Sequence, residues 1–430
     1  MKKGVIPIIL LIAIALFYFL YQNFSIKKTY DIVITGGGLS GLSAAYSLRA
    51  NNVLVLEKEN YTGGRVKTGE YKNIRYDLGA FFDYEGIPFA QEGIKFYNSN
   101  YILETGPIGI YYENKICTGM NVEACLKKLP FDQQSIESML KYSEDSSVLL
   151  SDKCHSVIST FFNAVHPGEM REYIHQRQSD AFIKFNISHY ALGHRELVEW
   201  FVKNSNADIY LNSFVESITD NGDMVSIIYN KNGFKRKVDS KAAVVTVNPA
   251  SALKIIKNIN PDTKKFLQQI KYASVTVVAL IIKNIKIPDF SYIVMNNSAS
   301  SAIFKQKTKE PDVNVFLIYF CDKASMNIEK LNRDKMIEVS KKELWKLASF
   351  KNEDILFTDY HYWPAACAII SDTAYSCWQN SYRRASRNVF LAGDYLYYNK
   401  KNILPLGMQA AIISGRETAF DMLMIKRTFK

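Results

Sequence analysis

The chain has 430 residues, which is too long for one small core and predicts two to three domain-sized units. Hydrophobic residues make up 48% and charged residues 22%, an ordinary globular balance, and the absence of a fixed-period repeat argues against a solenoid. The net charge of +11 comes from scattered lysines without a basic, aromatic-interleaved run, which argues against nucleic acid and leaves a solvated surface or anionic lipid as alternatives.

The first predicted element is an apolar helix. Residues 4–24 carry no charge, and a helix of about 21 residues is roughly 30 Å long, which matches the hydrocarbon core of a bilayer. A cleaved signal peptide is the competing interpretation, but it would have a shorter apolar core and small residues at a cleavage site. We therefore expect an uncleaved single-pass membrane anchor. Lysines flank both ends, so the leaflet that the rest of the chain faces is undecided.

A strand–turn–helix–strand unit follows this segment. Asp31–Thr35 and Val53–Leu56 are apolar and β-branched, as buried strands are, and Leu42–Leu48 is an apolar helical run between them. Such a unit is typical of a parallel sheet.

The turn of this unit carries a glycine pattern. Gly36, Gly38 and Gly41 satisfy GxGxxG, in which the first glycine permits a tight turn and the second lets the backbone approach a pyrophosphate. The third allows close packing of helix against strand. Leu39 and Ser40 begin the helix, whose free N–H groups and partial positive charge favour phosphate.

Glu57 ends the second strand, where a carboxylate can accept hydrogen bonds from the hydroxyls of an adenosine ribose. Because the strand, the helix and the acid are in register, the sequence predicts a dinucleotide site. A purely structural glycine turn is the alternative interpretation.

The rest of the chain alternates between helical and strand character. Residues 86–205 are expected to be mainly helical. Strands are expected at 208–219, 224–230, 242–247 and 389–392, strands with turns over 270–330, and an apolar helix from about Met408 to Met424. Glycine-containing turns at 221–223 and 231–233 predict a hairpin or meander.

Sheet-like pieces near both ends therefore bracket a long middle. The predicted fold class is α/β: a Rossmann-type nucleotide-binding domain assembled from discontinuous segments, an inserted α+β substrate domain, and an N-terminal transmembrane helix. The predicted ranges are 4–24 for the anchor, 30–85, 206–255 and 386–430 for the nucleotide-binding segments, 86–205 for the helical part of the substrate domain and 256–385 for its sheet part.

Segments at both ends of the chain carry a family resemblance. They read GGGLSGLSAAYSLR at 36–49, EKENYTGGR at 57–65, YDLGA at 76–80 and RNVFLAGDYLYYNKKNILPLGMQAAIISGR at 387–416. Together they resemble the flavin-containing amine oxidase superfamily, which also includes protoporphyrinogen oxidases and phytoene desaturases. Two fainter segments, GHRELV from Gly193 and the strands around Val215 and 242–249, fit the same family, whereas residues 86–185 do not resemble it.

This resemblance implies FAD as the cofactor. Gly64 would bend the backbone against a phosphate, and Arg65 would supply a planar cation for that phosphate. Asp394 would bind the ribityl or phosphate region, and the helix beginning at Gly407 and Met408 would point its N-terminus at the flavin ring. The implied cofactor residues are Gly36, Gly38, Leu39, Ser40, Gly41, Glu57, Lys58, Gly64, Arg65, Val215 (through its backbone, to adenine), Gly393, Asp394, Gly407 and Met408.

The chain also departs from the family pattern. Val277 stands where many amine oxidases carry a lysine near flavin N5, and the nearest lysine is Lys283, which puts rapid oxygen-driven amine oxidation in doubt. The loop after AGD lacks the cysteine of covalent-flavin members, so the FAD should be non-covalent. Tyr397 or Tyr398 is expected either to form one side of an aromatic cage around the substrate or to pack within the loop.

The function implied is an FAD-dependent oxidoreductase that takes a hydride from an amine C–N bond or a C–C bond to flavin N5, with oxygen or quinone as final acceptor. Its substrate is expected to be small and, given the anchor, lipophilic. No metal site is indicated, because the six cysteines and six histidines lack ligand spacing, and no catalytic base is identified. A membrane-tethered non-catalytic flavoprotein and an NAD(P)-dependent dehydrogenase are the alternatives.

Overall fold

The structure, a computed structural model, describes residues 29–81, 83–84, 101–104, 107–142, 147–165, 187–190, 193–369, 371, 373–374, 383–396 and 407–428. The predicted anchor at residues 4–24 lies outside the described residues. None of the helices within these ranges is both long enough and apolar enough to cross a bilayer.

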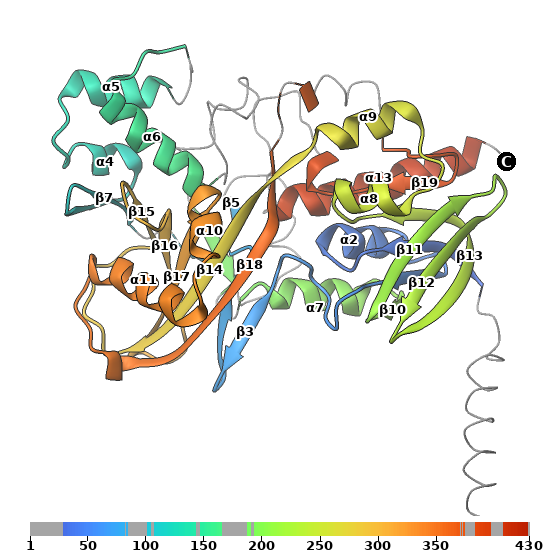
Figure 1. Ribbon diagram of the computed structural model, residues 1–430, viewed down its shortest axis with the longest axis horizontal. Helices are drawn as coiled ribbons and strands as arrows, with labels where there is room; N and C mark the ends of the chain where they lie inside the picture. The colour runs from blue at the N-terminus through green and yellow to red at the C-terminus, as the bar shows by residue number, and fades with distance from the viewer. Residues whose placement is uncertain are drawn as a thin grey trace, which may run out of the picture.

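The first of two large sheets lies on the right of Figure 1 and has the order β10–β2–β1–β13–β12–β11, with β19 paired to β13. Its strands are β1 (Tyr30–Thr35), β2 (Val53–Leu56), β10 (Asp208–Tyr210), β11 (Ser213–Asp220), β12 (Val225–Lys231), β13 (Phe234–Val245) and β19 (Val389–Leu391). β1 pairs in parallel with β2 and β13, as a strand–helix–strand crossover requires, whereas β11, β12 and β13 form antiparallel hairpins.

Helices cover both faces of this sheet. They are α2 (Leu39–Ser47), α7 (Arg195–Asn204), α8 (Pro249–Ile255), α9 (Pro261–Gln269) and α13 (Met408–Thr428), with the short η4 (Asp394–Leu396) after β19. Successive residues of β1 point to opposite faces, so Ile32 and Ile34 pack against α2 and α13, while Val33 shares a core with Phe266 of α9.

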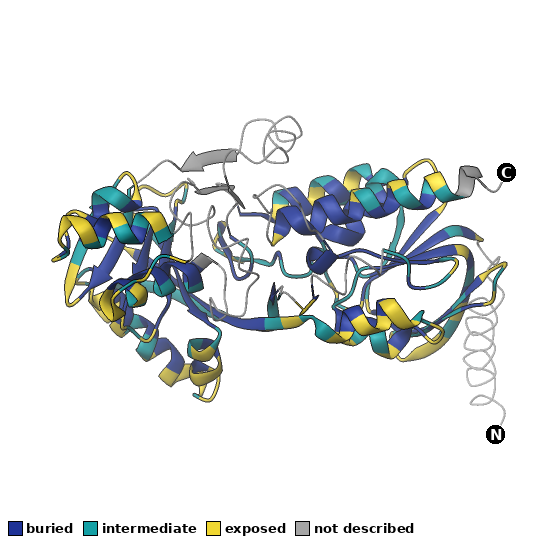
Figure 2. Ribbon diagram, turned by 90° about the horizontal axis from the view of Figure 1, so that it is seen from above, coloured by how far each residue is buried: buried dark blue, intermediate teal, exposed yellow. Residues whose placement is uncertain are grey.

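The second sheet, on the left of Figure 1, has the order β18–β14–β17–β16–β15–β7–β8. Its strands are β7 (Ile108–Tyr112), β8 (Lys115–Gly119), β14 (Lys271–Lys283), β15 (Tyr292–Met295), β16 (Ala302–Gln306), β17 (Val313–Cys321) and β18 (Ile355–Ile369). Helices α10 (Lys323–Ile328) and α11 (Arg333–Trp345) cover one face, and α4 (Val122–Leu126), α5 (Gln133–Tyr142) and α6 (Asp152–Val165) pack on the other, with η3 (Asn352–Asp354) leading into β18. Figure 2 accordingly shows buried residues gathered in two blocks.

Two small sheets complete the described chain. β3 (Thr68–Tyr71) and β4 (Ile74–Asp77) form a hairpin, and β5 (Asp83–Tyr84), β6 (Tyr101–Glu104) and β9 (Ile187–Tyr190) form a three-stranded sheet. The β3–β4 hairpin lies between the two large sheets and extends downward in Figure 1.

Most predicted elements are confirmed, and two details add to the predicted organisation. The described part of residues 86–205 is mainly helical, as expected, and also contains strands β6 to β9, because short β-branched and aromatic runs such as IGIYY favour strands. Helix α9 lies beyond the predicted boundary at residue 256, yet its Phe266 and Leu267 pack into the core of the first sheet.

Candidate functional site

The glycine turn after β1 is a tight connection in which two of the three glycines are required by the fold itself. Gly36 has a φ of +108°, and a Cβ there would lie 2.6 Å from Thr246 Oγ1. A Cβ on Gly41 would collide with the carbonyl oxygen of Gly36. Gly38 differs, because its Cβ would meet the Cα of Gly64 at 3.8 Å and the carbonyl oxygen of Gly63 at 4.0 Å, both ordinary contacts. The protein leaves space beside Gly38 that its own packing does not need.

Helix α2 begins at this open space without a cap. Its N-cap residue is Gly38, no side chain caps its amide groups, and its first turn contains no acidic residue. Ser40 Oγ is buried and has no hydrogen-bond partner among the described residues. An uncapped helix N-terminus with an available hydroxyl fits a bound phosphate, which is the group predicted here.

Glu57 closes the other side of the turn. Its carboxylate accepts hydrogen bonds from the backbone N–H groups of Gly37, at 2.6 Å, and Glu59, at 2.9 Å. Burial raises the pKa of Glu57, and these two N–H groups act in the opposite direction on it. The carboxylate is therefore held in one orientation beside the turn, where it can accept ribose hydroxyls. Lys58 is exposed and pairs with Glu59 at 3.1 Å.

The start of β11 lies against this acid. The Ser213 N–H donates to the Glu57 carbonyl at 2.7 Å, and β11 contains a bulge between Val215 and Ser217. The bulge leaves Glu216 outside the ladder, whereas Val215 stays paired with Tyr229. The predicted main-chain contact of Val215 with adenine stays a prediction.

The GGR segment packs directly onto the glycine turn. Gly63 donates its N–H to the Gly37 carbonyl at 2.8 Å, and a Cβ on Gly63 would lie 3.0 Å from Val198 of α7. This contact explains why the GHRELV segment accompanies the nucleotide motif: its helix supports the bend that Gly63 and Gly64 make, at φ values of +109° and +59°.

Arg65 and Asp394 were expected to reach the cofactor separately, but the structure joins them. The Arg65 guanidinium donates to both oxygens of Asp394, at 2.8 Å each, and to the carbonyl of Ala366 in β18 at 2.6 Å. Tyr272 at the start of β14 donates its hydroxyl to Asp394 at 2.9 Å. The Arg65 side chain as a whole is 35% exposed, against 4% for that of Asp394.

Sequence reasoning missed Tyr272 and Ala366. Neither lies in a short motif, and each reaches Asp394 or Arg65 only because β14 and β18 cross from the second sheet to the first. No local signal marks them.

The late glycine-bearing segment packs against the early one. Ser43 of α2 donates its hydroxyl to the Ile412 carbonyl of α13 at 2.8 Å, and a Cβ on Gly415 would collide with the Ser40 carbonyl oxygen. The Gly393 N–H donates to Ser414 Oγ at 3.0 Å. Residues 36–43 thus meet residues 393–396 and 407–416 at one place, as predicted.

The N-terminus of α13 opens toward the same region. Gly407 has a φ of +58° and precedes Met408, which is buried with Leu39 and Leu42 of α2. Met408 therefore contributes apolar packing beneath the helix start. Tyr397 and Tyr398, the predicted substrate-cage residues, lie outside the described residues.

The second sheet presents one face to residues 65–80. Tyr319 of β17 donates its hydroxyl to the Gly79 carbonyl at 2.6 Å, and Trp363 of β18 donates its Nε1–H to the Leu78 carbonyl at 2.7 Å. Val277 of β14 is buried and lies in register between Tyr319 and His361. No lysine stands at this position of β14, but Lys67 approaches the same face from the GGR side, with its Nζ 3.2 Å from His361 Nδ1.

Among the described residues, neither a reactive thiol nor a metal-binding cluster is found at this site. The described cysteines are free, and burial raises the pKa of the Cys367 thiol in β18 to about 12, so it stays protonated near neutral pH. Among the described residues no group of three or more His, Cys, Asp or Glu side chains could hold a metal ion.

Comparison with known families agrees with this geometry. The profile of the NAD(P)-binding Rossmann-like domain matches residues 34–82, and that of the flavin containing amine oxidoreductases matches residues 109–423. The second match covers most of the chain.

Sequence relatives match over shorter stretches. A probable flavin-containing monoamine oxidase A from Dictyostelium discoideum is 31% identical over 135 residues, or 29% of this chain and 28% of that relative. A flavin-containing amine oxidase A from Equus caballus is 46% identical over 56 residues, or 12% of this chain and 11% of that relative. The alignments thus span less than a third of each relative's length.

Solved structures share the fold over nearly the whole chain. Cyclohexylamine oxidase from Brevibacterium oxydans has a TM-score of 0.75 at 12% identity, covering 93% of this chain and 100% of that one. Putrescine oxidase bound to putrescine has a TM-score of 0.72 at 13% identity, covering 92% of this chain and 99% of that one.

Proposed function

Because the chain belongs to the family of flavin-containing amine oxidoreductases, we propose that it is an FAD-dependent oxidoreductase that removes a hydride from an amine C–N bond or a C–C bond. When bound, FAD accepts this hydride at its N5 atom, and the protein supplies binding, orientation and charge. The names of the sequence relatives support an amine as the substrate.

The described residues fit a non-covalently held dinucleotide. The space beside Gly38 and the uncapped start of α2 take the diphosphate, and Glu57 takes the ribose of the adenosine. Arg65 would donate a hydrogen bond to a phosphate oxygen, and Asp394, which also accepts the Tyr272 hydroxyl, holds the Arg65 guanidinium in place. The α13 N-terminus stabilises negative charge on the flavin ring through its helix dipole.

The observation that carries this proposal is the space beside Gly38, which no packing requirement of the protein explains. Its test begins with the purified protein. We expect about one FAD per chain, with absorption bands at about 370 and 450 nm, released intact by denaturation because no covalent link holds it. Binding of NAD(P) alone, without flavin, would contradict the assignment.

The bond that is oxidised can be identified by anaerobic reduction. Amines, porphyrinogens and polyenes are mixed in turn with the oxidised flavoprotein, and loss of the band at about 450 nm reports electron transfer. We expect at least one class to bleach the flavin. If none does, the alternative of a non-catalytic flavoprotein gains, because Val277 occupies the position where amine oxidases often carry a lysine.

We also propose that residues 4–24 anchor the protein to a membrane, since an uncharged apolar segment of this length matches a bilayer. A lipophilic substrate or a quinone acceptor would concentrate in that bilayer. Removing residues 1–28 should yield a flavoprotein that stays in the supernatant after high-speed centrifugation. Continued sedimentation with membranes would mean that this segment is not the attachment.

A further inference from the structure

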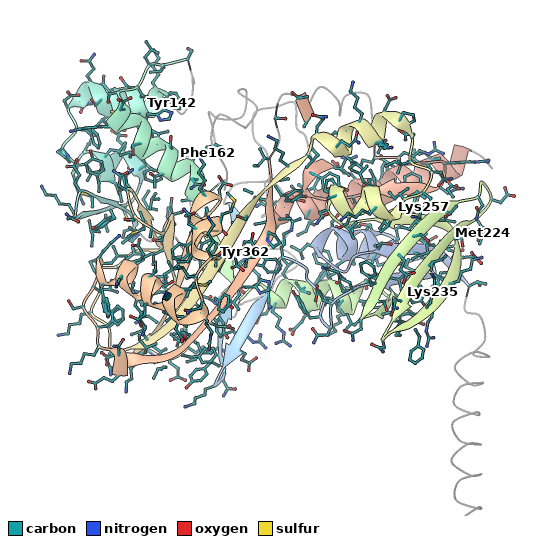
Figure 3. All side chains as sticks on the ribbon, viewed as in Figure 1. Tyr142, Phe162, Met224, Lys235, Lys257 and Tyr362 are labelled. Atoms are coloured by element: carbon teal, nitrogen blue, oxygen red, sulfur yellow. The ribbon has the colours of Figure 1, made fainter. Side chains whose placement is uncertain are left out.

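Helices α8 and α9, with the loop between them, form a basic layer on one side of the first sheet. Residues 249–269 bury their apolar side chains in the core of that sheet and expose every lysine they contain. We call these lysines the lysine face: Lys254, Lys257, Lys264 and Lys265. The only acid in the same stretch is the exposed Asp262, so four lysines against one aspartate leave a charge of +3. Figure 3 labels Lys257 on the right-hand part of the molecule, which carries the first sheet.

The lysine face begins at the edge of the sheet where β1 starts. Tyr30, the first residue of β1, and Asp220 of β11 stand in one row across β13 and β12. Because neighbouring strands are about 5 Å apart, this row is about 15 Å long. At its end the Asp220 N–H donates to Asn258 Oδ1 at 3.1 Å, and Asn258 directly follows Lys257.

The chain that joins the proposed anchor to β1 is short. The apolar segment ends at Phe24, and the first described residue is Thr29. Five steps along the chain separate them, which is at most about 18 Å of fully extended chain. The edge of the first sheet at which β1 starts is therefore held close to the surface of the bilayer that the anchor enters. Lys27 and Lys28 make this connection basic as well.

Charge decides which side of this edge turns toward the bilayer, since anionic headgroups attract lysine and arginine. The helix layer on the opposite side exposes Phe420 and Met424 of α13. The sequence of α13 holds three basic and two acidic residues, a net charge of +1, and both acids pair with Arg383. The lysine face, with its charge of +3, is the stronger match for an anionic surface.

We propose that the lysine face lies on the anionic headgroups of the bilayer that holds the anchor. The inference rests on the proposed membrane anchor at residues 4–24. In it the anchor holds the protein and the lysine face orients the domain. The glycine turn follows the other end of β1, whose six residues span about 20 Å, so the diphosphate end of the nucleotide site is kept away from the tethered edge.

The experiment measures which lysines the bilayer covers. The full-length protein is reconstituted into vesicles of phosphatidylcholine, or of phosphatidylcholine with phosphatidylserine, and acetylation of each lysine is followed by mass spectrometry. We expect the lysine face to be acetylated about fivefold more slowly in the vesicles that contain phosphatidylserine, because anionic headgroups cover it. This protection should disappear in about 1 M NaCl, where the screening length falls to about 3 Å.

Lys283 and Lys286 provide the internal reference. Both are exposed, and Lys283 ends β14, whose 13 residues place it about 40 Å from Lys271 at the other end of the strand. Their acetylation should not depend on the lipid. Normalising to these two lysines also corrects for any protein that faces the inside of the vesicles.

Matched double variants test whether charge causes the protection. In Lys257→Glu/Lys264→Glu, we expect the two remaining lysines of the lysine face to be acetylated equally fast in both kinds of vesicle. In Lys283→Glu/Lys286→Glu, the whole lysine face should stay protected by phosphatidylserine. All four substituted positions are exposed and lie outside the nucleotide site, so flavin content should be normal in both variants.

The outcomes separate the surface from the anchor. Equal acetylation of the lysine face in both kinds of vesicle, or protection of Lys426 in α13 in its place, would overturn the proposed surface. Protein that resists an alkaline carbonate wash of the vesicles in that case would leave the anchor standing. If the wash removes the protein, but the lysine face was protected by phosphatidylserine before it, the anchor is wrong and the surface stands.

Discussion

The two ends of the candidate site are assembled from the chain in different ways. At the diphosphate end, the glycine turn, the start of α2 and Glu57 all lie within residues 36–57. At the junction of the two sheets, Arg65 meets Asp394 across 329 positions and Lys67 meets His361 across 294 positions. The first end is a self-contained local motif, whereas the second exists only when both large sheets are packed together.

Because of this difference, substitutions at the two ends should affect protein stability and cofactor binding in different ways. At the diphosphate end, each glycine has its own role, so fold and cofactor binding can be separated by changing one residue at a time. At the junction of the two sheets, the same contacts hold the sheets together and position the cofactor, so stability and flavin retention should change together.

The largest effect should come from Gly41. A Cβ at this position would collide with the Gly36 carbonyl oxygen, and shifting this backbone segment to relieve the collision would cost stability. We expect Gly41→Ala to cost roughly 3–5 kcal/mol of unfolding free energy, measured by urea denaturation. Loss of FAD without loss of stability in this variant would show that the packing role assigned to Gly41 is wrong.

A smaller effect is expected at Asp394. Asp394→Ala leaves Arg65 without its carboxylate and Tyr272 without its acceptor, and we expect a cost of about 2–3 kcal/mol, discounted because the guanidinium is partly exposed. Flavin content and the urea midpoint should fall together.

Asp289 provides the control for this change. Its carboxylate is 80% exposed and lies 3.9 Å from Lys305 Nζ, so Asp289→Ala should alter neither stability nor flavin content measurably. A stable Asp394→Ala protein with normal flavin would contradict the coupling of the two sheets through this pair.

The smallest effect concerns pH. The pKa of His361 is lowered to about 4 in the folded protein, from 6.5 in a free side chain, so the unfolded chain binds the extra proton first as pH falls. Stability should therefore decrease between about pH 6.5 and pH 4, with His361 contributing on the order of 1 kcal/mol after allowance for solvent. Melting temperatures of wild type and His361→Asn should converge as pH falls; parallel curves would mean that His361 titrates normally.

The contrast between contacts close along the chain and contacts between distant segments also explains which parts of the site the sequence could predict. Gly41 meets the Gly36 carbonyl, and Glu57 accepts the Gly37 N–H, so spacing along the chain was enough to place these residues together at the turn. The binding of ribose by Glu57 stays a prediction. β2 and β19 were located within a residue because apolar, β-branched runs mark buried strands.

Tyr272 and His361 could not be predicted in the same way. Each belongs to a long strand of the second sheet, and its partner is set by how β14 and β18 cross to the GGR segment, which no local spacing records. The Arg65–Asp394 pair was missed for the same reason, although both residues had been singled out individually. Predicting such contacts requires the packing of the two sheets.

The central claim, that the space beside Gly38 holds the diphosphate of FAD, is tested most directly by FAD titration of the Gly38→Val apoprotein, with Gly222→Asn as the control at a glycine with nothing nearby. A Cβ at position 38 would make only ordinary contacts, so we expect the Gly38→Val apoprotein to fold and to bind FAD about 100-fold more weakly, while Gly222→Asn binds FAD normally. Normal FAD affinity in Gly38→Val would contradict the account.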